Sequence, residues 1–223
     1  KAEFLALDLA DLASVRACAE AFLKRGLPLP LLVCNACLAG AKGVTRQGFE
    51  LTFGVCHVGH FLLTQLLLPR IKQSTPARIV VVASRAHTRV GGIDFEAVLK
   101  PTATATGFPE YGVAKLANVL FASELAKKLA GSGVTTYSLH PGVVATDVWR
   151  EVPGPLAFLA KLFMKSPTDG AATTLHCALS EQAGKETGLY YDECKVKAAS
   201  KVGQDAVLAK RLWDESERWI AAA

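Results

Sequence analysis

Apolar segments of strand length alternate along the chain with segments of helical periodicity, which is typical of βαβ units built around a parallel sheet. Continuous apolar or β-branched runs predict strands at residues 4–9, 31–34, 78–84, 134–139 and 189–191. Apolar positions three and four residues apart predict helices at residues 12–26, 48–72, 111–130 and 204–220, with another helix beginning at Ser166. The pattern indicates one α/β domain over residues 1–223, without an internal repeat or linker.

Composition and charge narrow the class of protein. The chain has 223 residues, of which 51% are hydrophobic and 20% charged, so it can bury a sizeable core and is not a disordered polyelectrolyte. Six cysteines in this length do not suggest a disulfide-stapled scaffold. The net charge of +5 is dispersed without a run of basic residues, and we therefore expect no nucleic-acid partner.

Tyr111 and Lys115 are the central candidates for chemistry. A spacing of four residues at the start of a helix places both side chains on one face. A phenol is a weak acid at neutral pH, and a nearby ammonium group favours its ionised form. A tyrosine activated in this way can exchange a proton with a carbonyl or alcohol oxygen. The spacing alone also fits an ordinary surface pair.

Polar and turn residues at the carboxyl ends of the predicted strands strengthen the catalytic interpretation. In open α/β sheets this edge binds ligands, and nucleotides in particular. The residues concerned are Asp8, Asn35, Ala36, Ser84, Pro141 and Gly142.

Three segments, residues 30–63, 111–121 and 133–144, are similar to the short-chain dehydrogenase/reductase family, and to its retinol dehydrogenase and WW-domain-containing oxidoreductase branch in particular. The resemblance covers essentially the whole chain. It implies a three-layer, Rossmann-type, doubly wound parallel sheet. It also implies that Tyr111 is the proton donor or acceptor, that Lys115 holds the nicotinamide ribose and lowers the pKa of Tyr111, and that Ser84 binds the substrate oxygen. The implied cofactor contacts are Asp8, Leu9, Asn35, Ala36, Tyr111, Lys115, Pro141, Gly142, Val143 and Thr146.

The same resemblance implies an oxidoreductase that interconverts a lipophilic alcohol and carbonyl, such as a retinoid or steroid, with NADP(H), although NAD is possible. The apolar residues 155–164 occupy the place of the family's substrate lid; they could line a pocket, touch a membrane peripherally or pack in the core. A lipid carrier is a third reading of this segment. Helices 48–72 and 111–130 are where the family usually forms homodimers. We expect a cytoplasmic or membrane-associated protein, at the endoplasmic reticulum if an N-terminal anchor exists.

The chain departs from the family pattern at its start. It lacks the Gly-rich turn that follows the first strand and holds the cofactor's pyrophosphate. We therefore expect an N-terminally truncated fold in which strands one and two of the family's sheet are absent. In the family these two strands lie between the third and fourth, so residues 4–9 should detach from the sheet and residues 31–34 should form an exposed, hydrophobic edge.

Two cysteines replace residues that the family uses near the cofactor. Cys56 stands where an asparagine usually supports a proton-relay water, and a thiol cannot reproduce the hydrogen bonds of an amide. Cys37 stands where the family has glycine and adds bulk there. With the missing turn, these changes favour an alternative: a catalytically impaired pseudoenzyme or interaction protein that has lost nucleotide binding.

A metal site is a further alternative. Cysteine and histidine at close spacing are ligand types suited to zinc, and this chain has Cys34, Cys37, Cys56, His57 and His60. The first pair lies at a strand end, and the histidines match a family motif that holds no metal. We therefore predict no metal site.

Overall fold

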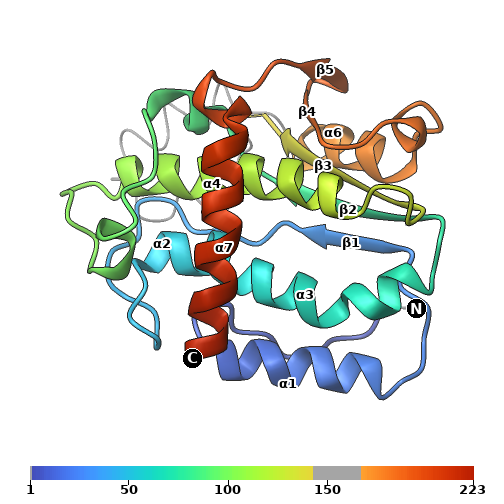
Figure 1. The fold of residues 1–223 in the computed structure, drawn as a ribbon, viewed down its shortest axis with the longest axis horizontal. Helices are drawn as coiled ribbons and strands as arrows, with labels where there is room; N and C mark the ends of the chain where they lie inside the picture. Colours follow the sequence, from blue (N-terminus) through green and yellow to red (C-terminus); the bar gives the residue numbers. More distant parts are fainter. Residues whose placement is uncertain (1, 143–166) are drawn as a thin grey trace.

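The computed structural model describes residues 2–142 and 167–223. Its five-stranded sheet has the order β1-β2-β3-β4-β5 (Figure 1). The strands are β1 (Leu31–Cys34), β2 (Ala77–Val82), β3 (Val134–His140), β4 (Leu189–Asp192) and β5 (Lys195–Lys197). β1 to β4 are parallel, as expected, and β5 is an antiparallel addition that the sequence pattern did not predict.

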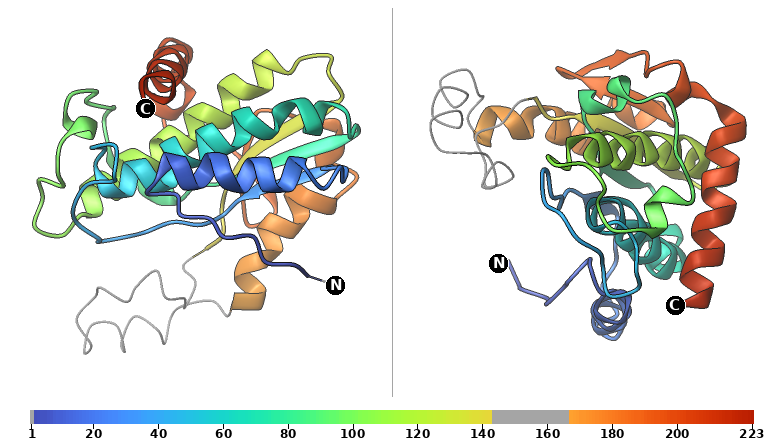
Figure 2. Two further views of the ribbon diagram at one scale, coloured as in Figure 1. Left: turned by 90° about the horizontal axis from the view of Figure 1, so that it is seen from below. Right: turned by 90° about the vertical axis from the view of Figure 1, so that its left-hand side faces the viewer.

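Helices cover both faces of the sheet and give the predicted three layers. The longer helices are α1 (Leu12–Leu23), α3 (Gly59–Lys72), α4 (Phe108–Lys128), α6 (Pro167–Leu179) and α7 (Ala206–Ala222). α3 and α4 pack on one face, with α1 against α3 and α7 across α4, while α6 packs on the opposite face (Figures 1 and 2). The shorter helical segments are α2 (Leu51–Phe53), η1 (Gly54–Val58), η2 (Arg85–Arg89), η3 (Ala97–Leu99), η5 (Ala183–Lys185) and η6 (Val202–Gln204).

Aromatic side chains join α3, α4 and α7 into the larger part of the core. The ring of Phe61 lies 5.4 Å from that of Phe121 and 5.0 Å from that of Trp213, measured between centroids. Phe61 is fully buried, and its neighbours are nearly so. Burying rings of this size contributes several kcal/mol in total, so this cluster holds α4 against the rest of the domain.

Residues 4–9 do not form the predicted strand. This extended segment runs beside α1 and α3 in the same direction as β1, without pairing to the sheet (Figure 1). Leu9 is buried against Gly59, since a Cβ at Gly59 would lie 2.7 Å from the Leu9 carbonyl oxygen. The backbone N–H of Asp8 also donates a 2.9 Å hydrogen bond to the Ser14 hydroxyl in α1. β1 is consequently the edge strand, with the Val33 side chain exposed. The expected detachment and the exposed apolar edge are both confirmed, and the strand assignment was wrong because its neighbouring strands are not there to pair with it.

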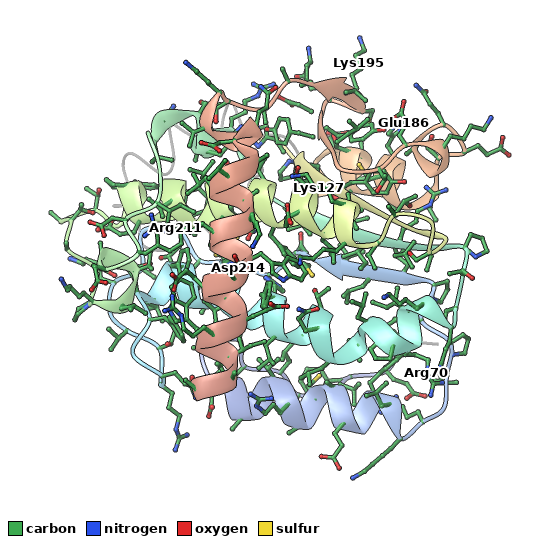
Figure 3. The ribbon with its side chains drawn as sticks, in the orientation of Figure 1. Arg70, Lys127, Glu186, Lys195, Arg211 and Asp214 are labelled. Carbon is green, nitrogen blue, oxygen red and sulfur yellow. The ribbon has the colours of Figure 1, made fainter. Side chains whose placement is uncertain are left out.

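The predicted helix at residues 48–72 is interrupted by a π-helical turn, η1. Such turns often lie at functional sites, and this one carries Cys56. Within the described residues, Leu51–Lys72 is the one helical stretch long and apolar enough to cross a membrane, but 78% of its apolar window is buried inside the protein, as in a core helix. Charged side chains such as Lys127, Arg211 and Asp214 lie instead on the outside, with both signs interspersed (Figure 3).

Candidate active site

The candidate residues gather at the carboxyl ends of β1, β2 and β3. These strands are neighbours and parallel, so the residues that follow them share one edge of the sheet. Asn35 and Ala36 after β1 are exposed, Pro141 and Gly142 after β3 are half-buried, and Ser84 after β2 is buried. Gly142 has a φ of 97°, a backbone conformation that favours glycine. The residues predicted after these three strands therefore share one edge of the sheet, whereas Asp8 follows no strand.

α4 presents Lys115 and Tyr111 to this edge. The Lys115 side chain is only 1% exposed, and its Nζ donates a 2.8 Å hydrogen bond to the carbonyl oxygen of Val82, at the end of β2. The same Nζ lies 5.5 Å from the centroid of the Tyr111 ring. The four-residue spacing thus places an ammonium group beside the phenol, as the sequence predicts.

Ser84 reaches Tyr111 because the loop after β2 packs tightly on α4. A Cβ at Gly112 would lie 2.8 Å from Cγ1 of Val90, so the glycine allows this approach. The Ser84 hydroxyl accepts a 3.1 Å hydrogen bond from the backbone N–H of Ala86. Ser84 also acts to lower the pKa of the Tyr111 phenol, which shows that it lies near this side chain. A serine, a tyrosine and a lysine from two different elements therefore converge.

His87 connects the loop that carries Ser84 to Ser200 by two hydrogen bonds. Its Nε2 accepts a 3.1 Å hydrogen bond from the backbone N–H of Ser200, so Nδ1 carries the proton and donates to the Ser84 carbonyl oxygen at 2.6 Å. Burial lowers the pKa of His87, which favours this neutral form. These contacts give His87 a structural part in the loop that carries Ser84.

The pKa of Tyr111 is raised, although Lys115 acts to lower it. Burial of the phenol is the largest effect, and the nearby Cys37 adds to it because a thiolate disfavours a second negative charge. Sequence reasoning expected the ammonium group to dominate. It missed that Cys37 also interacts with the Lys115 ammonium group.

Cys37, Cys56 and Lys115 influence one another's ionisation. A hydrogen bond from Cys56 is the main cause that lowers the pKa of Cys37 to about 6, and the charge of Lys115 lowers it further. The pKa of Cys56 is correspondingly raised by this hydrogen bond and by burial. Burial alone would lower the pKa of Lys115, but the two cysteines outweigh it and the net direction is upward. The three groups therefore shift one another's pKa values: the pKa of Cys37 is lowered, and the pKa values of Cys56 and Lys115 are raised.

Asn118 is a residue of this site that the sequence reasoning missed. Its Nδ2 donates a 3.2 Å hydrogen bond to the Val82 carbonyl oxygen, which it shares with Lys115, while its buried Oδ1 has no hydrogen-bond partner. The sequence feature that could have identified Asn118 is its position three residues after Lys115, which puts it on the same face of the helix. Asn118 helps to fix the end of β2 against α4.

The remaining candidates are placed differently or lie outside the described residues. Asp8 is exposed and its carboxylate accepts a hydrogen bond from the backbone N–H of Ala10, whereas the Leu9 side chain is used in the core. Val143, Thr146 and the apolar segment 155–164 lie outside the described residues.

The cysteines and histidines considered as metal ligands contact different partners rather than one another. Cys34 Sγ lies 3.7 Å from the Thr64 hydroxyl, His57 Nε2 lies 2.9 Å from the Ser216 hydroxyl, and His60 Nδ1 lies 3.1 Å from the Cys56 carbonyl oxygen. Over residues 2–142 and 167–223, no group of three or more such side chains is placed to hold a metal ion.

The residues at this edge of the sheet suit the nicotinamide end of a dinucleotide. Exposed backbone at Asn35 and Ala36 and the glycine turn at Gly142 adjoin the buried Lys115 ammonium, which suits a ribose and a flat ring.

Comparison with known proteins identifies the class. The short chain dehydrogenase family model matches residues 1–155, and the chain belongs to this family. Dehydrogenase/reductase SDR family member 13 of Bos taurus is 46% identical over 224 residues, which cover 96% of this chain and 58% of that protein. Retinol dehydrogenase 12 of Homo sapiens is 45% identical over 214 residues, covering 94% of this chain and 67% of that protein. The chain thus spans little more than half to two thirds of the length of these relatives.

Solved structures agree with the fold. An uncharacterized protein from Mycobacterium paratuberculosis is 32% identical with a TM-score of 0.74, over 96% of this chain and 74% of that one. A 3-ketoacyl-(acyl-carrier-protein) reductase from Brucella melitensis, solved in complex with NADH, is 25% identical with a TM-score of 0.60, over 84% of this chain and 75% of that one. The Rossmann-type fold and the retinol-dehydrogenase-like branch expected from the sequence are confirmed.

Proposed function

We propose that this chain carries the catalytic part of an oxidoreductase that interconverts a lipophilic alcohol and carbonyl with a nicotinamide cofactor. The observation that carries the proposal is the convergence of Ser84, Tyr111 and Lys115 at the strand-end edge, with the Lys115 Nζ 5.5 Å from the Tyr111 ring. The relatives named above are a dehydrogenase/reductase and a retinol dehydrogenase, which supports this reaction class.

Tyr111 is the group that moves the proton. Its hydroxyl donates to the carbonyl oxygen during reduction, or accepts from the alcohol during oxidation, and Ser84 holds that oxygen in place by a hydrogen bond. Lys115 stabilises the phenolate that Tyr111 becomes after it donates, since the ammonium acts to lower the pKa of the phenol. The cofactor, when bound, supplies or accepts the hydride, and Asn35, Ala36, Tyr111, Lys115, Pro141, Gly142, Val143 and Thr146 would hold its nicotinamide end. Asp8 and Leu9 are the proposed contacts to the adenine end.

NADP(H) is the proposed cofactor, with NAD as the alternative, and a retinoid or steroid is the proposed substrate class. The similarity to retinol dehydrogenases supports the substrate class. Both choices are tested by comparing the two cofactors against one set of lipophilic aldehydes and ketones, with the alcohol product measured by chromatography.

Two variants test the proton-transfer role. Tyr111→Phe removes the hydroxyl and should abolish nearly all turnover while leaving the fold intact. Tyr190→Phe is the matched control because the buried Tyr190 hydroxyl has no hydrogen-bond partner among residues 2–142 and 167–223, so its loss should leave both stability and turnover nearly unchanged. If Tyr111→Phe retains the activity of the parent protein, Tyr111 does not carry the proton.

A non-catalytic protein is the second candidate, and the interaction of Cys37 and Cys56 with Lys115 favours it. Cys37 interacts with the Lys115 ammonium that would otherwise hold the ribose, and Cys37 and Cys56 stand where the family has glycine and asparagine. Titration of this chain with NADPH, followed by fluorescence, separates the two candidates. Micromolar binding rejects a protein that has lost nucleotide binding, and the absence of binding favours it.

A homodimer, peripheral membrane contact and a cytoplasmic or membrane-associated location are further parts of the proposal. α3 and α4 are the helices expected to pair between subunits, and within this chain α1 packs on α3 and α7 packs on α4. These contacts leave less of α3 and α4 exposed for a second subunit. The mass of the protein in solution, measured by light scattering, therefore tests the homodimer directly.

A further inference from the structure

We propose that Arg85 and His87 are positioning residues, which anchor the loop that carries Ser84 (residues 84–90, the Ser84 loop) to the segment that begins at the end of β4 (residues 192–200). Through this anchoring they set the place of the Ser84 hydroxyl relative to Tyr111. The role rests on the proposed function, in which Ser84 holds the substrate oxygen while Tyr111 moves the proton.

Arg85 makes the first of the two connections. Its Nε donates a 2.6 Å hydrogen bond to Oδ2 of Asp192, and its Nη2 donates a 3.0 Å hydrogen bond to Oδ1 of the same carboxylate. The Asp192 side chain is only 8% exposed, whereas the Arg85 side chain is 57% exposed. Two parallel hydrogen bonds to one carboxylate fix the orientation of a guanidinium as well as its position. Arg85 is therefore held at one point of β4 although it lies near the surface.

This connection spans the end of the strand next to the proposed cofactor turn. β3 lies between β2 and β4 in the sheet (Figure 1). Arg85 follows β2 by three residues, while Asp192 is the last residue of β4 and is paired in register with His140, the last residue of β3. The Pro141–Gly142 turn comes directly after His140. Arg85 thus fixes the Ser84 loop relative to the turn that is proposed to hold the nicotinamide end.

The turn that follows Asp192 has an unusual backbone. Asp192 pairs with Lys195, so Glu193 and Cys194 alone connect β4 to β5. Their φ angles are 53° and 58°, in the left-handed region where two-residue hairpin turns usually have asparagine and glycine. The Cys194 backbone N–H donates a 3.3 Å hydrogen bond to the Thr173 hydroxyl in α6. Backbone strain of this kind persists where the surrounding structure fixes it, and it is concentrated at functional sites. The end of β4 is therefore a fixed point for Arg85.

His87 makes the second connection, from the Ser84 loop to the helix that presents the phenol. Its Nε2 accepts a 3.1 Å hydrogen bond from the Ser200 backbone N–H, and its Nδ1 donates to the Ser84 carbonyl oxygen at 2.6 Å. The Ser200 hydroxyl in turn accepts a 3.1 Å hydrogen bond from the Gly203 N–H in η6. A Cβ at Gly203 would lie 3.4 Å from Cγ1 of Val119, so η6 packs directly on α4.

The hydroxyl of Ser84 has to follow any movement of this loop. Its Oγ accepts from the Ala86 backbone N–H at 3.1 Å, and the Ser84 carbonyl oxygen accepts from the His87 backbone N–H at 3.2 Å, so both contacts lie within the loop. Misplacing a group that contacts the reacting atoms by about 1 Å can lower a rate by about 100-fold. Loss of the anchoring should therefore reduce turnover more than substrate binding.

Steady-state kinetics of all-trans-retinal reduction with NADPH test the first connection. Arg85→Met should lower kcat by about 10- to 100-fold and change KM by less than about threefold, because the lost positioning acts in the transition state. Arg85→Lys should recover only part of kcat, since an ammonium keeps the charge but cannot donate two parallel hydrogen bonds. It also supplies the comparison if Arg85→Met does not fold.

Two matched variants serve as controls for the loss of a surface charge. Glu193→Gln neutralises an exposed carboxylate that lies 3.7 Å from Nη2 of Arg85, and Lys210→Met removes an exposed ion pair with Asp214 on α7. Exposed ion pairs of this kind contribute little, so both variants should keep the kcat of the parent protein.

Two variants of His87 test the second connection. Glutamine can place its amide oxygen near the position of Nε2 and still accept from the Ser200 N–H, whereas asparagine reaches only the position of Nδ1. His87→Asn should therefore lower kcat by about tenfold or more, and His87→Gln should retain much of the parent's kcat. Hydrogen–deuterium exchange should be faster in residues 84–90 of His87→Asn and unchanged in α4. Equal kcat values for the parent protein, His87→Asn and His87→Gln overturn this part of the role.

The kinetics also separate this role from the proposed function. A parent protein without turnover of any lipophilic carbonyl overturns the proposed function and the positioning role together. Turnover that a folded Arg85→Met protein retains in full overturns the positioning role alone. A raised KM with unchanged kcat in this variant overturns it as well, because that result indicates lost substrate binding instead of a misplaced Ser84. Near-UV circular dichroism, recorded at the temperature of the assay, verifies that each variant is folded.

Discussion

Gly112→Ala probes the contact that brings Ser84 beside Tyr111. An alanine in the interior of α4 would by itself stabilise the helix by about 1 kcal/mol relative to glycine. Its Cβ, however, would lie 2.8 Å from Val90 Cγ1 and 3.3 Å from the Ala86 carbonyl oxygen, so the η2 loop has to move. Overpacking of this kind costs about 1–3 kcal/mol, and we expect a net loss of about 1 kcal/mol in the free energy of unfolding.

Val90→Ala supplies the control because it removes the atom nearest to the new methyl group. In the Val90→Ala background, Gly112→Ala should be neutral or stabilising, so the coupling between the two substitutions should be about 1–2 kcal/mol. Urea unfolding of the four proteins, followed by circular dichroism, measures it. If Gly112→Ala has the same effect in both backgrounds to within about 0.3 kcal/mol, the loop does not press on α4 as described.

Three further predictions concern stability. His57 and His60 are buried with pKa values of about 3 and about 4, so they are neutral in the folded protein while the unfolded chain binds protons below about pH 6.5. The free energy of unfolding should therefore fall as the pH drops from about 6.5 toward 4, by roughly 1 kcal/mol per pH step for each histidine. In the His57→Gln variant only one of these histidines remains, so its urea unfolding midpoint should fall about half as steeply with pH. Phe61→Ala should cost about 3–5 kcal/mol in urea unfolding, and a loss below about 1 kcal/mol would mean that the aromatic cluster is not packed as described. Arg85→Met should cost about 1–3 kcal/mol because it leaves the buried Asp192 carboxylate without its two hydrogen bonds, and a neutral effect on the melting temperature would contradict this.

Periodicity and strand-end chemistry predicted most of the fold. The β1 prediction matches the observed strand, and α4 begins three residues before the predicted start, at Phe108, because Gly107 adopts a left-handed conformation that ends the preceding loop. Residues 4–9 show the limit of such reasoning: an apolar run has strand-like composition whether or not a neighbouring strand is there to pair with it.

The arrangement around Lys115 could be predicted only in part. Helical spacing placed Tyr111 and Lys115 together, since that contact is local. The contacts of Cys37 with Cys56 and with Lys115 depend on how the β1 loop, the π-helical turn and α4 pack, and no pattern within one segment encodes that packing. For the same reason the direction of the Tyr111 pKa shift could not be derived from the spacing alone.

Transfer of a labelled hydride tests the central claim most directly. The protein is incubated with all-trans-retinal and NADPH deuterated at the transferable position of the nicotinamide, and the retinol formed is examined by mass spectrometry. We predict retinol that carries one deuterium, formed by the parent protein and by Tyr190→Phe but not by Tyr111→Phe. Equal amounts of deuterated retinol from Tyr111→Phe and from the parent protein would contradict the account.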